Sequence, residues 1–219
     1  MTNVNELTSI SRNKTETEKE IEEIFAQDKT PYKSGKNFRV SDLGCCWRKR
    51  YMELKELYKE KIDSKLQRIF DMGNNIHEMI FKELAEKHGD YKIIGAEVNI
   101  PDIGKRISGR CDLILSKSSN GEIVICDIKS CGKWTMDKAK EGIVDDNYKS
   151  QVNMYVHLFQ TSMKIKTGVL ILVDKTNGDI EIIEIPYDKQ LAESQIKEVT
   201  NFFDNFVDKN ICPEKCINP

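Results

Sequence analysis

The change of hydrophobic period along the chain constrains the fold more than any other feature of the sequence. Five short apolar stretches have the length and residue types of β-strands, and the segments before, between and after them have the spacing of helices. The turn Ser118–Gly121 joins the second and third strands, and Asn177-Gly178 is typical of a hairpin between the last two. The predicted strands are 92–100, 106–115, 122–130, 168–173 and 179–185.

The helix boundaries follow from capping residues. Thr15 and Glu18 match a capping box, Ser41 is predicted to cap a second helix, and Asp188 is predicted to cap the last one. The resulting order, α-β-β-β-α-β-β-α, predicts an α/β fold with a mixed central sheet flanked by helices and a helical N-terminal region. The predicted helices are 15–27, 41–58, 64–88, 146–161 and 188–207.

Length and composition favour one globular domain. The 219 residues are 39% hydrophobic and 32% charged, which suffices for a real core. We expect residues 1–37 to form a flexible N-terminus with a short helix and linker, and 38–219 to form the domain. The sequence shows neither the roughly 18 apolar residues of a membrane span nor a signal peptide, so a cytoplasmic protein is expected.

Two acidic residues and a lysine lie on neighbouring predicted strands. Asp127 and Lys129 share one face of ICDIKS, and Asp112 with Arg110 shares a face of the preceding strand, opposite Cys111 and Leu113. Pairing of the two strands would bring the carboxylates together, and convergent carboxylates suit a hard divalent cation that polarises a phosphodiester. A surface ion pair at a strand end is the alternative interpretation, which a lone D-x-K pattern favours.

Three further patterns accompany this one in a fixed order. Gly73 and His77 form G-x-x-x-H on a predicted helix, and Gln151 and Tyr155 lie at i and i+4 on a later helix. Together with G-R-x-D and D-x-K, they resemble the PD-(D/E)XK nucleases of the RecB type, especially CRISPR-associated and phage exonucleases. The resemblance covers about residues 38–216 and implies the restriction-endonuclease-like core.

The resemblance also implies roles for these residues. Asp112, Asp127 and the backbone carbonyl of Ile128 would hold Mg²⁺ or Mn²⁺, and His77 would add a nitrogen ligand that suits Mn²⁺. Lys129 would activate the attacking water, and Gln151 and Tyr155 would orient the substrate and support the lysine. Taken alone, His77 beside Phe81 and Leu84 is more typical of a core histidine, and Glu97 of an exposed strand carboxylate.

The cysteines cluster near the two ends of the domain. Seven cysteines in a reducing compartment are expected to be thiols or metal ligands, and the resemblance implies an iron–sulfur cluster. Only two cysteines lie downstream, so a four-cysteine site would need Cys45, Cys46, Cys212 and Cys216, although adjacent helical residues diverge by about 100°. We therefore expect a [4Fe–4S] cluster on Cys46, Cys212, Cys216 and either Cys45 or another ligand. Zinc and plain thiols remain alternatives. Cys111, Cys126 and Cys131 are interpreted as structural.

Basic and aromatic residues surround the predicted site. A net charge of -2 does not exclude a local basic groove, and Arg48, Lys49 and Arg110 could contact DNA phosphates. Tyr148, Trp47 and Trp134 could stack on unpaired bases. The sequence therefore predicts a metal-dependent deoxyribonuclease acting on DNA ends or single strands, in CRISPR adaptation, phage recombination or repair. A non-catalytic DNA-end-binding or assembly subunit, and a structure-specific endonuclease, are the alternatives.

Overall fold

The predicted mixed sheet is present in a computed structural model, which describes residues 14–26, 35–58, 62–87, 89–101, 104, 106–160 and 162–214. Five strands lie in the order β2-β4-β5-β6-β7, and only the β5–β6 pair is parallel. A separate pair, β1 with β3, is also parallel. The main strands are β2 (Tyr91–Asn99), β4 (Arg110–Lys117), β5 (Ile123–Cys131), β6 (Ile165–Asp174) and β7 (Ile180–Pro186); the short ones are β1 (Phe38–Arg39) and β3 (Ile107–Ser108).

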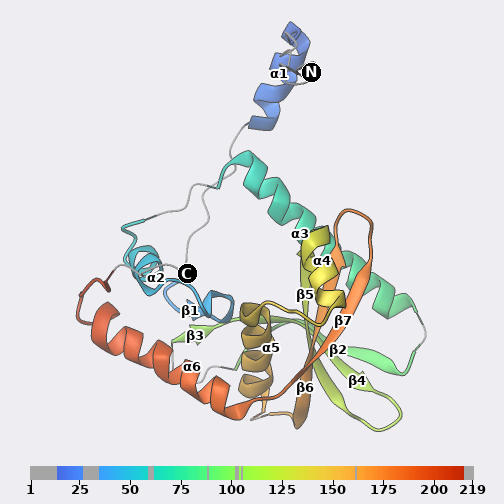
Figure 1. The fold of residues 1–219 in the computed structure, drawn as a ribbon, viewed down its shortest axis with the longest axis vertical. Helices are drawn as coiled ribbons and strands as arrows, with labels where there is room; N and C mark the ends of the chain where they lie inside the picture. The colour runs from blue at the N-terminus through green and yellow to red at the C-terminus, as the bar shows by residue number, and fades with distance from the viewer. Residues whose placement is uncertain are drawn as a thin grey trace, which may run out of the picture.

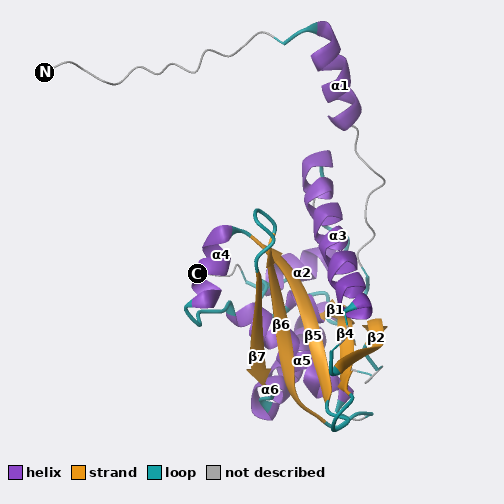
Figure 2. Ribbon diagram, turned by 90° about the vertical axis from the view of Figure 1, so that its right-hand side faces the viewer, coloured by secondary structure: helices purple, strands orange, loops and turns teal. Residues whose placement is uncertain are grey.

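Helices cover both faces of the sheet (Figures 1 and 2). On one face, α3 packs Ile76 and Ile80 against the β4 and β5 side chains Leu113 and Cys126. On the other, α5 and α6 pack with Ile114 and Ile125, and α4 covers β6 and β7. The helices are α1 (Glu16–Ala26), α2 (Trp47–Leu54), α3 (Ser64–Glu86), α4 (Lys133–Lys140), α5 (Asp146–Phe159) and α6 (Lys189–Phe202).

The N-terminal helix differs in packing from the others. Glu18 and Thr15 form the predicted capping box of α1, but α1 buries no residue. It lies beyond the start of α3 (Figure 2), and Arg68 of α3 donates a hydrogen bond to the Phe25 carbonyl. The linker predicted at 31–37 falls largely outside the described residues.

The predicted helix over 41–58 is wrong in its beginning. A 3₁₀ turn, Val40–Asp42, comes first, and Gly44 with φ of 81° then turns the chain before α2 starts at Trp47. The side chain of Asp42 accepts hydrogen bonds from Arg39 and pairs with buried Arg50. Tertiary pairing therefore overrides Ser41 as a cap.

Two other helical segments also depart from the prediction. Helix α4 was not predicted, because it is only eight residues long, contains many charged residues and follows β5 almost directly. The last helix ends at Phe202 and continues as a π-helical turn, η2 (Phe203–Val207). No described helix combines the length and the apolar character needed to cross a bilayer.

Candidate active site

The site forms where β4 and β5 separate. Their antiparallel pairing runs from Ser116↔Ile123 to Leu113↔Cys126 and stops there. Beyond that point, Oδ2 of Asp112 accepts the hydrogen bond of the Ile128 amide at 2.7 Å, in place of a backbone carbonyl. A side-chain hydrogen bond thus takes the place of a backbone hydrogen bond between β4 and β5. It fixes the Asp112 carboxylate against the backbone of β5.

The expected alternation of β4 fails at the same place. Cys111 and Leu113 were predicted to share a face, yet Cys111 packs in the α5-side cluster and Leu113 in the α3-side cluster. At Asp112 the strand has left the β5 ladder, although it stays paired with β2 as far as Arg110, and it no longer follows the two-residue period. This irregularity lets Asp112 reach α3 as well as β5.

Asp127 is the most buried charged group of the site, with 1% of its surface exposed. Gln151 donates a hydrogen bond to its Oδ1 at 3.1 Å, and its Oδ2 forms an ion pair with the Lys129 ammonium. Burial raises the pKa of Asp127 to about 6, Lys129 lowers it, and the negative charge of Asp112 raises it again. The predicted D-x-K pair is therefore buried together, which a surface ion pair would not be.

Helix α5 supplies the second support of this carboxylate. Nε2 of Gln151 also donates to the Tyr155 hydroxyl at 3.3 Å, so the two residues form one network with Asp127. Tyr155 is buried, and burial followed by the charge of Asp127 raises the pKa of its hydroxyl. A Cβ on Gly109 would lie 3.0 Å from the Tyr155 ring, which explains the glycine of G-R-x-D.

Helix α3 brings the histidine over the separated strands. Nδ1 of His77 lies 3.7 Å from Oδ1 of Asp112, and a quarter of its side chain is exposed. A Cβ on Gly73, one turn earlier, would lie 3.7 Å from Oγ of Ser130 on β5. The spacing G-x-x-x-H therefore places a small residue over β5 and an imidazole beside Asp112.

These groups present oxygen and nitrogen donors to one place. Because the N–H and C=O of one strand residue point to the same edge, the Ile128 carbonyl faces the gap where Asp112 holds the Ile128 amide. Carboxylate and carbonyl oxygens are ligands of hard divalent cations. In the part of the chain that the structure describes, no three His, Cys, Asp or Glu side chains are close enough to hold an ion by themselves.

The family of the chain follows from a match that includes His77, Asp112, Asp127, Ile128 and Lys129. The model of the PD-(D/E)XK nuclease superfamily matches residues 76–209, more than half of the chain. The chain belongs to the PD-(D/E)XK nuclease superfamily. The matched segment begins just before His77 and includes the β4–β5 separation and the Gln151–Tyr155 network. The predicted resemblance to this superfamily is therefore confirmed.

Solved structures with the same fold include several exonucleases. An alkaline exonuclease from Laribacter hongkongensis, LHK-Exo, is 15% identical with a TM-score of 0.59, covering 80% of this chain and 89% of its own; it has also been solved in complex with dAMP. A phage related exonuclease from Haemophilus somnus 129PT is 12% identical (TM-score 0.54, covering 80% and 96%). SSO0001 is 22% identical (0.52, covering 90% and 94%). No curated protein matches significantly.

The predicted DNA-binding residues of this PD-(D/E)XK chain divide into two groups. Tyr148 lies beside the site, with the Lys129 ammonium 5.9 Å from its ring centre. Arg110 also lies at the start of β4, where it pairs with the exposed Glu97 at 3.1 Å. Arg48 and Lys49 lie instead on α2, which packs on η2, and they contact the Pro213 carbonyl and Glu53.

The two tryptophans differ in their surroundings. Trp47 packs between Phe38 and Phe202, with ring centres 5.4 and 4.9 Å away, so the prediction that it stacks on bases is wrong. Trp134 on α4 is 70% exposed, and the Lys138 ammonium lies 3.8 Å from its ring centre. Lys138 was not among the predicted site residues, because its i, i+4 spacing from Trp134 has meaning only on a helix and α4 was not predicted.

The cysteines also divide into two groups. Cys111, Cys126 and Cys131 are buried thiols, as predicted. Cys45 is half-buried, Cys46 caps α2 and forms a disulfide, and Cys212 is an exposed thiol; Cys216 lies outside the described residues. Because α2 starts at Trp47, the helical divergence expected for the adjacent pair does not apply.

Proposed function

We propose that this PD-(D/E)XK protein is a metal-dependent DNA exonuclease whose catalytic groups are Asp112, Asp127 and Lys129. The burial of Asp127 carries the proposal. A carboxylate that is 1% exposed, with a pKa raised to about 6 and a second carboxylate nearby, is unfavourable for stability alone. Such an arrangement becomes favourable when a divalent cation neutralises both groups.

The donor set fits Mg²⁺ or Mn²⁺. Asp112, Asp127 and the Ile128 carbonyl would hold the ion, and His77 would add a nitrogen that favours Mn²⁺. The bound ion would polarise the scissile phosphate and lower the pKa of a water molecule. Water and a substrate oxygen would complete the coordination shell around these protein ligands.

Each protein group then has a separate task. The Lys129 ammonium, beside Asp127, can hold the attacking water and stabilise negative charge on the phosphate. Gln151 keeps the Asp127 carboxylate oriented, and Tyr155 keeps Gln151 oriented. Their hydrogen bonds fix the carboxylate before substrate arrives, which reduces reorganisation during the reaction.

The fold relatives favour an exonuclease over the other substrate specificities. The names of two of them describe exonucleases, and LHK-Exo was solved with dAMP. We therefore infer DNA ends or single strands as the substrate of this chain, in phage recombination, CRISPR adaptation or repair. In this proposal, Tyr148 beside Lys129 and the exposed Trp134 on α4 would stack on unpaired bases.

The test compares end-labelled linear DNA with circular single-stranded DNA. We expect mononucleotide release from linear DNA with Mg²⁺ or Mn²⁺, none with EDTA, and none from Asp112→Ala, Asp127→Ala or Lys129→Ala. Cleavage of circles would instead indicate the endonuclease, and metal-independent DNA-end binding without any cleavage would indicate the non-catalytic subunit. Unchanged cleavage by a folded Asp127→Ala protein would refute the proposal.

We also propose that the terminal cysteines act together, as ligands of a [4Fe–4S] cluster. Arg48 beside Cys46 donates a hydrogen bond to the carbonyl of Pro213 beside Cys212, so the two cysteine segments lie together. Burial, and then the charge of Asp42, raises the pKa of Cys45 to about 11, which makes Cys45 a poor thiolate donor. Anaerobic purification with iron analysis decides: a brown, iron-containing protein supports the cluster, and an iron-free one with oxidised Cys46 supports the disulfide instead.

A further inference from the structure

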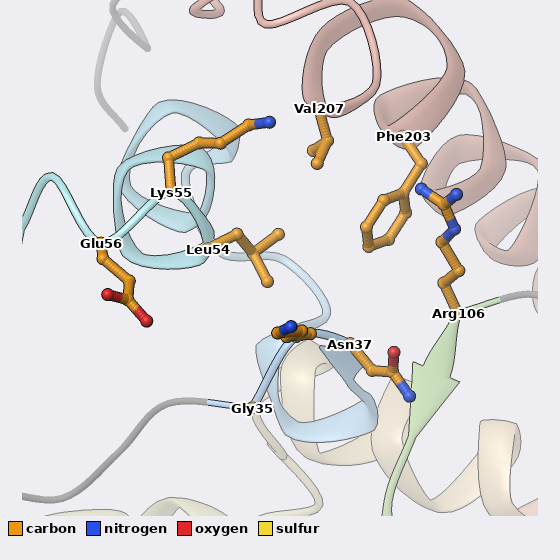
Figure 3. A pocket seen from close by; sticks show the side chains of 9 residues that line it. Gly35, Asn37, Leu54, Lys55, Glu56, Arg106, Phe203 and Val207 are labelled. Carbon is orange, nitrogen blue, oxygen red and sulfur yellow. The ribbon is translucent and has the colours of Figure 1, made fainter.

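A cavity outside the carboxylate site is lined by positively charged side chains over an apolar floor. Its volume is about 560 Å³, within the range of small-ligand sites. Leu54 of α2 with Phe203 and Val207 of η2 points into this space in Figure 3. We name it the α2–η2 pocket; it is lined by Gly35, Lys36, Asn37, Leu54, Lys55, Glu56, Arg106, Phe203 and Val207.

The cations of the α2–η2 pocket are held in place. The Arg106 guanidinium lies 5.1 Å from the centre of the Phe203 ring and forms an ion pair with Asp208. Lys55 donates a hydrogen bond from its ammonium to the Asn210 side chain at 2.5 Å. With Lys36, three positive charges face two negative ones, Glu56 and the Asp208 partner of Arg106, which leaves one net positive charge. An anion is therefore favoured inside it.

The backbone around the pocket is unusual. Four non-glycine residues in the described ranges have positive φ, and three of them, Glu56 (56°), Arg106 (55°) and Asn210 (56°), line the pocket or bind a lysine that does. Non-glycine residues in this conformation are held there by surrounding structure and cluster at ligand-binding places. For Arg106, the hydrogen bond from the Phe38 amide to its carbonyl provides this support.

We propose that the α2–η2 pocket binds a nucleotide unit: the phosphate between Lys36, Lys55 and Arg106, and the sugar and base over Leu54, Phe203 and Val207. A nucleotide contacts both the basic and the apolar parts of the lining, whereas an inorganic anion would leave the apolar floor without a partner. A nucleotide combines a charged phosphate with a flat, largely apolar base, which matches the two halves.

The pocket is connected to the carboxylates by one short segment. Arg106 precedes Asp112 by six residues, through β3 and the start of β4, so their Cα atoms are at most about 20 Å apart. A strand with duplex phosphate spacing covers that distance in about six nucleotides. If the chain is a DNA exonuclease, as proposed above, the nucleotide belongs to the strand that enters or leaves the site. This identification rests on that proposed function; nucleotide binding itself does not.

The experiment measures binding without cleavage. The full-length protein in EDTA is titrated with a fluorescent single-stranded hexanucleotide, and separately with dAMP, deoxyadenosine and inorganic phosphate. The variants are Lys36→Gln/Lys55→Gln and the control Lys166→Gln/Lys197→Gln, which removes two exposed lysines from β6 and α6. We expect the pocket variant to bind the hexanucleotide about tenfold more weakly than the control. For the pocket variant, the slope of log K against log salt concentration should be less steep by about 1.4. Two lysines are removed, and each single-strand phosphate contact contributes about 0.7 to the slope.

The ligands and a second variant distinguish the outcomes. Val207→Glu places a carboxylate in the pocket and should weaken hexanucleotide binding at least as much, with its melting temperature measured as a control for folding. Weakened dAMP binding in the same variants indicates a free nucleotide as a ligand too, and an effect on the hexanucleotide alone indicates a strand. Equal binding by the pocket and control variants, or phosphate binding as tight as that of dAMP, would overturn the proposal. Because no metal is needed, this result is independent of whether the protein cleaves DNA.

Discussion

The carboxylate site and the α2–η2 pocket are built in opposite ways. In the carboxylate site, short acidic side chains on adjacent central strands are fixed by the Ile128 amide and by Gln151. In the pocket, long basic side chains extend from a helix end, a strand end and a connecting segment. The first has rigid ligands and buried negative charge; the second has open positive charge.

This difference corresponds to two physical requirements. Holding a cation against a phosphate requires oxygen ligands positioned within a fraction of an ångström, which a sheet core provides. Holding a polyanionic strand requires charge and tolerance of movement, which lysines at the surface provide. Regions of opposite charge can therefore act on one substrate, with net charge close to zero over the whole chain.

The largest effect is expected in the carboxylate site, which is the more rigid of the two regions. Asp127→Asn should reduce metal-dependent cleavage at least about 10³-fold, because a neutral amide is a poor ligand for a hard cation. Steady-state release of labelled mononucleotide measures it. Asp174→Asn is the matched control, since Asp174 is equally buried on β6 but binds Thr176. Comparable losses in the two variants would indicate that burial of any aspartate, and not metal binding, explains the effect.

The lysine should have the next largest effect. Lys129→Met should reduce kcat about 10²-fold while KM for DNA changes little, because the ammonium acts on the reacting phosphate or water. Single-turnover cleavage measures the chemical step. Lys175→Met, an exposed lysine, should retain activity. A change confined to KM would place Lys129 with the strand-binding lysines and remove the distinction between the two regions.

The next effect in size is a pH dependence of the free energy of unfolding that comes from the carboxylate site. The pKa of Asp127 is higher in the folded protein, about 6, than its ordinary value of 3.8, so folding favours the protonated form. Its contribution to stability is therefore complete below about pH 4 and is lost as the pH rises through 6, on the order of 3 kcal/mol in all. Thermal unfolding of the metal-free protein between pH 4.5 and 7.5 measures it.

Two comparisons make this measurement specific. Asp127→Asn should remove the pH dependence and raise the melting temperature at pH 7.5, because an amide is not ionised. Mg²⁺ or Mn²⁺ should stabilise the wild type at pH 7.5 and not this variant. Equal pH dependence in both proteins would show that the Asp127 carboxyl does not cause it.

The smallest effect is expected at Trp134, which belongs to neither region. Trp134→Ala should weaken single-strand binding about tenfold and leave the melting temperature unchanged, because the side chain is 70% exposed and a stacked base is worth about 1–3 kcal/mol. Fluorescence anisotropy with a labelled oligonucleotide measures it, with exposed Ile143→Ala as the control. Equal weakening in both variants would argue against stacking.

Much of the fold and the main site could be predicted because both depend on local patterns. The five strands of the main mixed sheet follow from apolar runs and turn residues and are confirmed, whereas the short β1–β3 pair was not predicted. The set His77, Asp112, Asp127, Gln151 and Tyr155 was predicted from the order of its motifs and their resemblance to the nuclease family, and the structure brings these residues together. Helix α4 was not predicted and the start of α2 was predicted too early, because short, charged segments carry only a weak helical period.

The sequence by itself determined which residues can do chemistry: two acids and a lysine on neighbouring strands, a histidine before them, and an amide and a phenol after them. Only the tertiary structure decided that β4 separates from β5 at Asp112, which aims this carboxylate at α3 and β5 together. It also decided that α2, β3 and η2 meet around one basic cavity. Local spacing fixes which side chains share an element, whereas long-range packing fixes where separate elements end against one another.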